Sequence, residues 1–209
     1  DLNVLNHLGL NLYTNTPAVL TEIVSNAWDA DATEVHIDVN RENGTITIAD
    51  NGHGMNADDV EHKFLNVGYA RREDNRKKSP NGRNVMGRKG IGKLAMFSLA
   101  NDVSIFTKRQ NDDIVALKVN VPDLRRAIKE KREYDTETIN DTSFFNKSHG
   151  TTIVLADLAR EIKTTATYLK KHLARRFSIL GQAFNFKVFV NQEEITLDHR
   201  DYTSKIEFL

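Results

Sequence analysis

Residues 20–55 read LTEIVSNAWDADATEVHIDVNRENGTITIADNGHGM, and this stretch decides the fold. Its first part has the spacing of an amphipathic helix, with apolar side chains at i, i+3, i+4 and i+7. These side chains are Leu20, Ile23, Val24 and Ala27. The spacing predicts a helix from about 18 to 31 that packs its apolar face against the rest of the domain.

Two runs of alternating apolar and polar residues follow this helix. Residues 35–39 and 46–48 alternate in this way, and Asn43-Gly44 lies between them. Asn-Gly between two alternating runs is the strongest short-range signal of a β-hairpin. The second strand leads directly into a turn with two glycines, residues 50–54. A helix followed by a hairpin predicts a fold that combines helices with hairpin-joined strands.

The rest of the chain continues this combination without an internal repeat. Further helices are predicted at about 56–66, 93–100, 158–164 and 167–180, and strands at about 103–107, 114–121, 151–155 and 184–190. Asn56 can cap the first of these helices. Two stretches lack such patterns, and we predict a long loop, the lid (about 66–92), and a charged surface insertion (about 123–148). We expect one α+β domain spanning 1–209, a two-layer sandwich whose mixed β-sheet is covered on one face by helices.

Composition narrows the class of protein. With 209 residues, 39% hydrophobic and 28% charged, the chain is typical of a soluble globular protein. The absence of cysteine excludes a disulfide scaffold, a thiolate metal site and a cysteine nucleophile. A net charge of +0 favours neither nucleic acid nor membrane as a partner. We expect a cytoplasmic protein without a membrane span and, because it starts at Asp1, a piece of a longer chain with downstream domains.

A polar stripe lies on the first predicted helix. At about 100° per residue, Glu22, Asn26 and Asp29 share one side, opposite the apolar face. Hard oxygen ligands of this kind suit Mg²⁺, and a carboxylate one turn away can deprotonate a water molecule. The alternative is that the stripe is simply the solvated side of a surface helix. Asn26 argues against it, because asparagine is a mediocre helix former in mid-helix.

The turn Asp50-Asn51-Gly52-His53-Gly54-Met55 is a second candidate for a binding site. Gly52 and Gly54 leave room for a flat ring to approach the backbone and permit positive φ. Asp50, at the end of its strand, could accept a hydrogen bond from an exocyclic amine. The alternative is a tight turn with no ligand, since Asn-Gly and similar pairs form turns in many proteins.

The third candidate is the glycine run Gly87-Arg88-Lys89-Gly90-Ile91-Gly92-Lys93, which precedes a predicted helix. Backbone amides at a helix start form an anion site. From Arg71 to Lys93 there are nine Lys or Arg and two acids, a local net of +7, which favours phosphate. The alternative is a disordered basic loop. A P-loop is excluded, because Leu94 stands where Ser or Thr is required and no strand leads in.

Taken in order, these motifs resemble the GHKL ATPases, the superfamily of gyrase, heat-shock chaperone, histidine kinase and mismatch-repair ATPases. Residues 20–30 resemble the Glu-x-x-x-Asn-x-x-Asp motif, and 50–55 the Asp-x-Gly-x-Gly-Met turn. Residues 87–92 resemble the glycine-rich end of the lid, and 149–152 the terminal Gly-Thr signature. The likeness is closest to bacterial stand-alone chaperone-like and MORC-like members.

The resemblance implies the Bergerat ATP-binding fold and a role for each matching residue. Glu22 would be the general base for the attacking water, and Asn26 would bind Mg²⁺. Asp50 would contact the adenine amine, with Thr151 beside it. The nucleotide-binding residues implied are Asn26, Asp29, Asp50, Gly52, Gly54, Met55, Gly87, Gly90, Ile91, Gly92, Lys93 and Thr151.

The function implied is Mg²⁺-dependent ATP binding and slow hydrolysis. Closure of the lid on ATP would act as a switch for dimerisation of a larger protein. One alternative is a protein kinase domain of the histidine-kinase branch. Another is a nucleic-acid-binding ATPase that uses 71–93 or 170–176 as its contact surface, although the net charge does not support it.

Overall fold

The computed structural model describes residues 15–65, 78–86, 92–158, 165–180 and 184–200. A mixed sheet of eight strands forms one layer, in the order β5-β4-β3-β6-β2-β1-β7-β8. The strands are β1 (Glu34–Asn40), β2 (Thr45–Asp50), β3 (Ala100–Lys108), β4 (Val115–Asn120), β5 (Glu137–Thr138), β6 (Gly150–Leu158), β7 (Lys187–Val190) and β8 (Glu193–Glu194). Only β1 and β7 pair in parallel among these strands.

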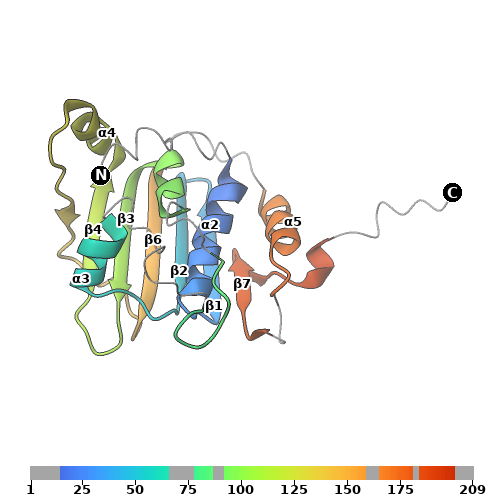
Figure 1. Ribbon diagram of the computed structural model, residues 1–209. Coiled ribbons are helices and arrows are strands. Elements are labelled where there is room, and N and C mark those ends of the chain that lie inside the picture. Colours follow the sequence, from blue (N-terminus) through green and yellow to red (C-terminus); the bar gives the residue numbers. More distant parts are fainter. Residues whose placement is uncertain (1–14, 66–77, 87–91, 159–164, 181–183, 201–209) are drawn as a thin grey trace.

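Helices form the second layer (Figure 1). The helical segments are α2 (Thr16–Asp29), α3 (Ala57–Asp59), the π-helix η1 (Val60–Leu65), the 3-10 helix η2 (Gly92–Ser98), α4 (Val121–Glu130), α5 (Ala166–Arg176) and the 3-10 helix η4 (Leu197–Arg200). Helix α2 contacts both η2 and α5, and α4 contacts β3 and β4. The predicted α+β fold, a mixed sheet with helices on one face, is confirmed. Among the described residues, no helix is long and apolar enough to cross a membrane.

Local signals explain how the first elements begin and end. The side chain of Asn15 accepts a hydrogen bond from Ala18 N at 2.9 Å, which caps α2. The chain leaves this helix through Asp31, which has a φ of 60°. The hairpin of β1 and β2 then forms as predicted, with Gly44 at a φ of 61°. The predicted cap Asn56 is also confirmed, because it forms a capping box with Asp59.

The hydrophobic core lies between the sheet and the helices. Inward-facing strand residues such as Ile48, Ile105 and Leu155 join Leu20 and Val24 of α2 in one buried cluster. Because successive strand residues point to opposite faces, Phe106 points away from this core. It forms a smaller cluster with Ala116 and Phe145 on the other face of the sheet. That second cluster holds the segment before β6 against the sheet.

The structure differs from the sequence prediction in several stretches. The helix predicted at 167–180 is α5, which ends at Arg176. Residues 121–130, mostly predicted as irregular surface insertion, form helix α4. It is capped by the Asn120 side chain and ends at Lys131, which has a φ of 55°. The helix forms because Val121, Leu124, Ala127 and Ile128 all lie on one buried face. Leu158, predicted to begin a helix, is the last residue of β6, and 159–164 lie outside the described residues.

Candidate functional site

Three polar side chains from three adjacent strands meet at one end of the sheet. Asp50 of β2 pairs with Thr151 of β6, which pairs with Thr107 of β3. All three share the strand face of the main core residues, so they point toward the helices. The hydroxyl groups of Thr107 and Thr151 are 3.0 Å apart. The structure therefore brings together Asp50 and Thr151, the two residues expected to contact adenine.

Thr107 ties the glycine turn to this sheet end. Its side chain is fully buried, and its Oγ1 accepts a hydrogen bond from Met55 N at 2.9 Å. The same oxygen lies 3.2 Å from the carbonyl oxygen of Gly150, to which it can donate. One hydroxyl thus fixes both the end of the turn and the start of β6. Met55, which the resemblance places near adenine, is half-buried against the main core.

The glycines of the turn allow close contacts within the protein. Gly54 has a φ of 65°, and a Cβ there would lie 1.9 Å from the carbonyl oxygen of Lys108. A Cβ on Gly52 would lie 2.8 Å from the carbonyl oxygen of Ala30, at the end of α2. The positive φ predicted for this turn is confirmed at Gly54. The turn is therefore packed between α2 and β3, which fixes where Asp50 stands.

Asp50 is held as a partly enclosed carboxyl group. Its Oδ1 accepts a hydrogen bond from Gly52 N at 2.8 Å. Burial raises the pKa of Asp50, and this effect is opposed by hydrogen bonds from backbone amides and by the charge of Lys147. The Nζ of Lys147 donates to the main-chain oxygen of Asp50 at 3.1 Å. Burial lowers the pKa of Lys147, while Asp50 and Glu34 favour its charged form.

The polar stripe of α2 is made as predicted, but its members differ in surroundings. Glu22 and Asn26 are half-exposed, and neither side chain has a hydrogen bond or ion pair with any described residue. Asp29 is only 4% exposed, and its Oδ1 accepts a hydrogen bond from Met86 N at 2.7 Å. Asp29 therefore holds the backbone that leads into the glycine run at 87–92.

The residues present fit a magnesium ion that is held mainly by phosphate. Among the described residues, no group of three or more Asp, Glu and His side chains could hold a metal ion by itself. Asn26 offers one carboxamide oxygen on an open side of α2. Mg²⁺ commonly takes one or two protein ligands and completes its shell with phosphates and waters. A site of this kind would be complete only with nucleotide.

The described part of the predicted lid, residues 78–86, is a tight loop attached to the end of α2. Ser79 and the backbone of Asn81 donate to the carboxylate of Asp31. The guanidinium of Arg83 lies 4.3 Å from the Trp28 ring centroid and donates to main-chain oxygens of Ala32 and Asn185. These contacts join the loop to α2, to the turn before β1 and to the segment before β7.

Only some of the remaining residues predicted to bind phosphate lie in the described part of the chain. Gly87, Gly90 and Ile91 lie outside the described residues. Gly92 and Lys93 begin η2, which packs on α2.

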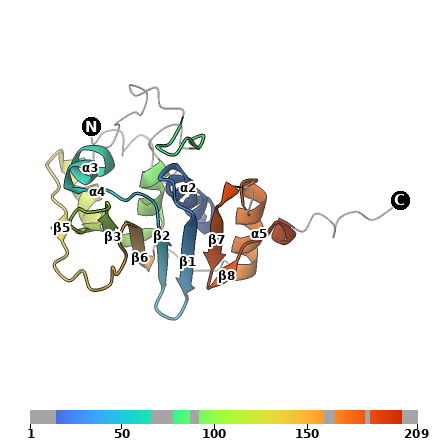
Figure 2. The ribbon, with the colours of Figure 1, turned by 90° about the horizontal axis from the view of Figure 1, so that it is seen from below.

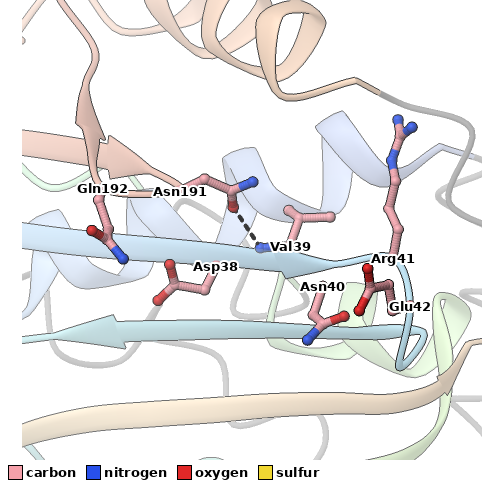
Figure 3. A pocket seen from close by; sticks show the side chains of 7 residues that line it. All are labelled: Asp38, Val39, Asn40, Arg41, Glu42, Asn191 and Gln192. Atoms are coloured by element: carbon pink, nitrogen blue, oxygen red, sulfur yellow. Dashed lines mark hydrogen bonds between the residues drawn. The ribbon is translucent and has the colours of Figure 1, made fainter.

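A surface hollow lies elsewhere, at the hairpin end of β1 (Figure 3). It is lined by Asp38, Val39, Asn40, Arg41, Glu42, Asn191 and Gln192. It is separate from the candidate site, because Asp50 pairs with Val35 at the opposite end of β1.

Sequence analysis missed Thr107, Lys147 and His149 as members of the site. Thr107 has a signal, since it continues the inward alternation of Val103 and Ile105 to the strand end. His149, whose Nδ1 lies 2.7 Å from the carbonyl oxygen of Gly52, stands in the Gly-Thr signature itself. Lys147 has no such signal, because its contact with Asp50 depends on the sheet order.

Comparison with known proteins gives the family. Residues 13–151, more than half of the chain, match the family described as "Histidine kinase-, DNA gyrase B-, and HSP90-like ATPase". The whole chain is 38% identical to "Putative type II restriction enzyme HgiDII" of Herpetosiphon aurantiacus, covering 34% of that protein.

Two chaperones are more distant. "Chaperone protein HtpG" of Vesicomyosocius okutanii is 27% identical over 85% of the chain and 31% of the relative. The HtpG of Sulfurimonas denitrificans is 23% identical over 97% of the chain and 33% of the relative. The chain thus spans about a third of the length of these relatives. From this family match, together with the α2 stripe and the Asp50 turn, we conclude that the chain belongs to the histidine kinase-, DNA gyrase B- and HSP90-like ATPases.

Proposed function

We propose that this domain binds ATP with Mg²⁺, hydrolyses it slowly and uses the bound nucleotide as a switch in a larger protein. Membership of an ATPase family supports nucleotide binding. The observation that carries the proposal is the arrangement of two pairs of polar side chains on the helix-covered side of the sheet. Asp50 and Thr151 offer a preformed contact for the base, and Glu22 and Asn26 offer polar side chains with no partner among the described residues.

Glu22 is the candidate general base. A carboxylate without an ion-pair partner in the described structure is available to orient a water molecule and to accept its proton. Asn26 lies one helical turn further and would bind the ion, which would supply charge neutralisation of the phosphates. Asp29 has a supporting role, because its contact with Met86 fixes the chain that enters the glycine run.

The switch depends on the segments around the described loop 78–86. That loop is attached on one side to α2 and on the other to the segment before β7. Triphosphate bound by the amides and cations of 87–93 would favour a closed lid only if it binds that form more tightly. We propose that the closed form creates a surface for a second copy of the chain, so that ATP controls dimerisation.

A second candidate function is an ATP-dependent module of a protein that acts on DNA. It is favoured by the match of the whole chain to HgiDII, which is named a "Putative type II restriction enzyme". In that case the domain binds ATP, and nucleic acid binding belongs to the complete protein or to the basic run 71–93. Affinity for DNA would then fall steeply with salt and would depend on ATP.

The test is a titration of the domain with ATP and with a non-hydrolysable analogue, each with and without Mg²⁺. We expect heat stability to rise with nucleotide, by RT ln(1 + [L]/Kd), and to rise further with Mg²⁺. Asn26→Ala should lose the Mg²⁺-dependent part, whereas the control Asn43→Ala, in the distant hairpin, should keep it. No binding at millimolar ATP would overturn the proposal.

Three further measurements separate the alternatives. With γ-labelled ATP, release of free phosphate supports the ATPase, and stable label on the protein supports a kinase. Light scattering with the analogue tests dimerisation, and an unchanged mass at saturating analogue contradicts the switch in this fragment. DNA binding measured at two salt concentrations, with and without ATP, tests the second candidate function.

A further inference from the structure

The contact between Lys147 and Asp50 has a consequence for which purine the site accepts. Lys147 belongs to the segment before β6, and its neighbour Phe145 packs with Phe106 on the sheet face away from the helices. The ammonium group of Lys147 donates to the main-chain oxygen of Asp50 at 3.1 Å. The carboxyl group of Asp50 lies on the other face, toward the helices.

The protonation state of Asp50 decides what it can recognise. An ionised carboxylate only accepts hydrogen bonds, whereas a protonated carboxyl group can also donate one. A 6-amino purine presents a donor at the position where a 6-oxo purine presents an acceptor. An ionised Asp50 thus favours the amino form and repels the oxo form, and a protonated Asp50 loses that distinction.

Two opposing influences act on this carboxyl group. Burial favours the protonated form, and the Gly52 and Thr151 amides together with Lys147 and His53 favour the ionised form. Around them stand Glu34, which interacts with Lys147, and His149, whose ring contacts the carbonyl oxygen of Gly52. Among the charged side chains of this set, Lys147 is the one that contacts Asp50 directly, and burial lowers the pKa of its ammonium group.

We propose that Lys147 is a positioning residue for purine selectivity, whose charge keeps Asp50 in the ionised, acceptor-only form and so favours ATP over a 6-oxo nucleotide. This inference rests on the proposed function, because it assigns selectivity to the same site. Lys147 itself touches no nucleotide and acts through Asp50. It also braces the strand end at which Asp50 is held.

The experiment compares ATP with ITP, whose base differs by the 6-oxo group in place of the 6-amino group. The variant is Lys147→Gln, which keeps a hydrogen-bond donor but removes the charge. Binding of both nucleotides is measured at several values between pH 6 and pH 8. The parent should prefer ATP by a ratio that changes little over this range. In the variant the ratio should fall at least severalfold at pH 6, and it should fall less at pH 8, because a higher pH favours the ionised form of Asp50.

Two control variants distinguish an effect of the Lys147 charge from a general change in structure. Lys147→Arg should restore the parent ratio, and Lys118→Met should leave it unchanged, since Lys118 of β4 pairs with Asp102 of β3 instead. Lys147→Met serves as a second uncharged variant if the first does not fold. The Asp50 carboxyl carbon, followed by NMR without nucleotide, should titrate at higher pH in either uncharged variant than in the parent.

The outcomes distinguish a failure of the selectivity proposal from a failure of the proposed function. If the parent binds no ATP, the proposed function fails and the selectivity inference fails with it. If the parent prefers ATP and an uncharged variant keeps the same preference at every pH, only the role of Lys147 is overturned. Identical Asp50 titration curves in parent and variant would overturn it as well.

Discussion

At the sheet end of the site, Thr107, Thr151 and the turn at 50–55 are joined to one another by hydrogen bonds within the protein. On α2, the side chains of Glu22 and Asn26 make none with the described residues. The first region is therefore formed before any ligand arrives, and the second has polar groups left to bind one. Under the proposed function, this difference would mean that the contact for the base is formed by the fold, whereas the phosphate end would be completed only by nucleotide.

The largest expected effect is a loss of stability when the preformed turn at 50–55 is disrupted. Gly54→Ala places a Cβ against the Lys108 carbonyl at a positive φ, so the turn must move away from β3. We expect a loss of more than about 3 kcal/mol in the free energy of unfolding, measured by urea titration. The control Gly44→Ala has a similar φ of 61° and open space around it, and should cost about 1 kcal/mol. Equal losses would mean that the turn is not constrained by packing.

Glu22→Ala tests whether the second region, on α2, supplies the general base for hydrolysis. Hydrolysis should fall roughly 10²-fold because a general base is lost, while ATP affinity is retained. Stability should change by no more than about 0.5 kcal/mol, since the side chain has no partner among the described residues. Phosphate release is measured against Glu42→Ala, an exposed glutamate at the far end of β1. Hydrolysis at the parent rate would remove Glu22 from the mechanism.

Asp50→Asn should separate stability from binding at the sheet end. Burial raises the folded-state pKa of Asp50 above its unfolded value, so its contribution to stability falls as pH rises through that interval. At pH 7 the amide, which keeps an acceptor for Gly52 N, should therefore make the nucleotide-free domain more stable. ATP affinity should fall roughly 10- to 100-fold with the loss of a charged acceptor. Thermal unfolding and titration test the two effects, and a less stable variant with parent affinity would contradict both.

The smallest effect concerns the loop that leads to the phosphate end. Arg83→Lys loses the planar contact with Trp28 and the paired donation to Ala32 and Asn185, at a cost of about 1–2 kcal/mol. Affinity for ATP should fall while affinity for adenosine, which lacks phosphate, stays the same. Lys78→Ala, an exposed change in the same loop, is the control. A parallel loss for both ligands would show that Arg83 supports the base end too.

Much of the fold could be predicted because its signals are local. The hairpin at Asn43-Gly44, the cap at Asn56 and the stripe on α2 each depend on neighbours a few residues away. Helix α4 was missed because four apolar side chains among many charged ones gave a weak periodic pattern. Thr107 and Lys147 could not be placed beside Asp50, since they are more than fifty residues away along the chain. Their contact follows from the order β3-β6-β2, which no local pattern encodes.

The two outermost strands set a limit on how copies of this domain can associate. β5 and β8 have two residues each, and three of these four residues are glutamates. Borders as short as these offer few free backbone groups to the sheet of a neighbouring molecule. In the described part of the chain, joining two sheets edge to edge is therefore disfavoured. An ATP-controlled pair of the kind proposed would then use another surface, and on the helical side the nucleotide itself could decide whether the surfaces match.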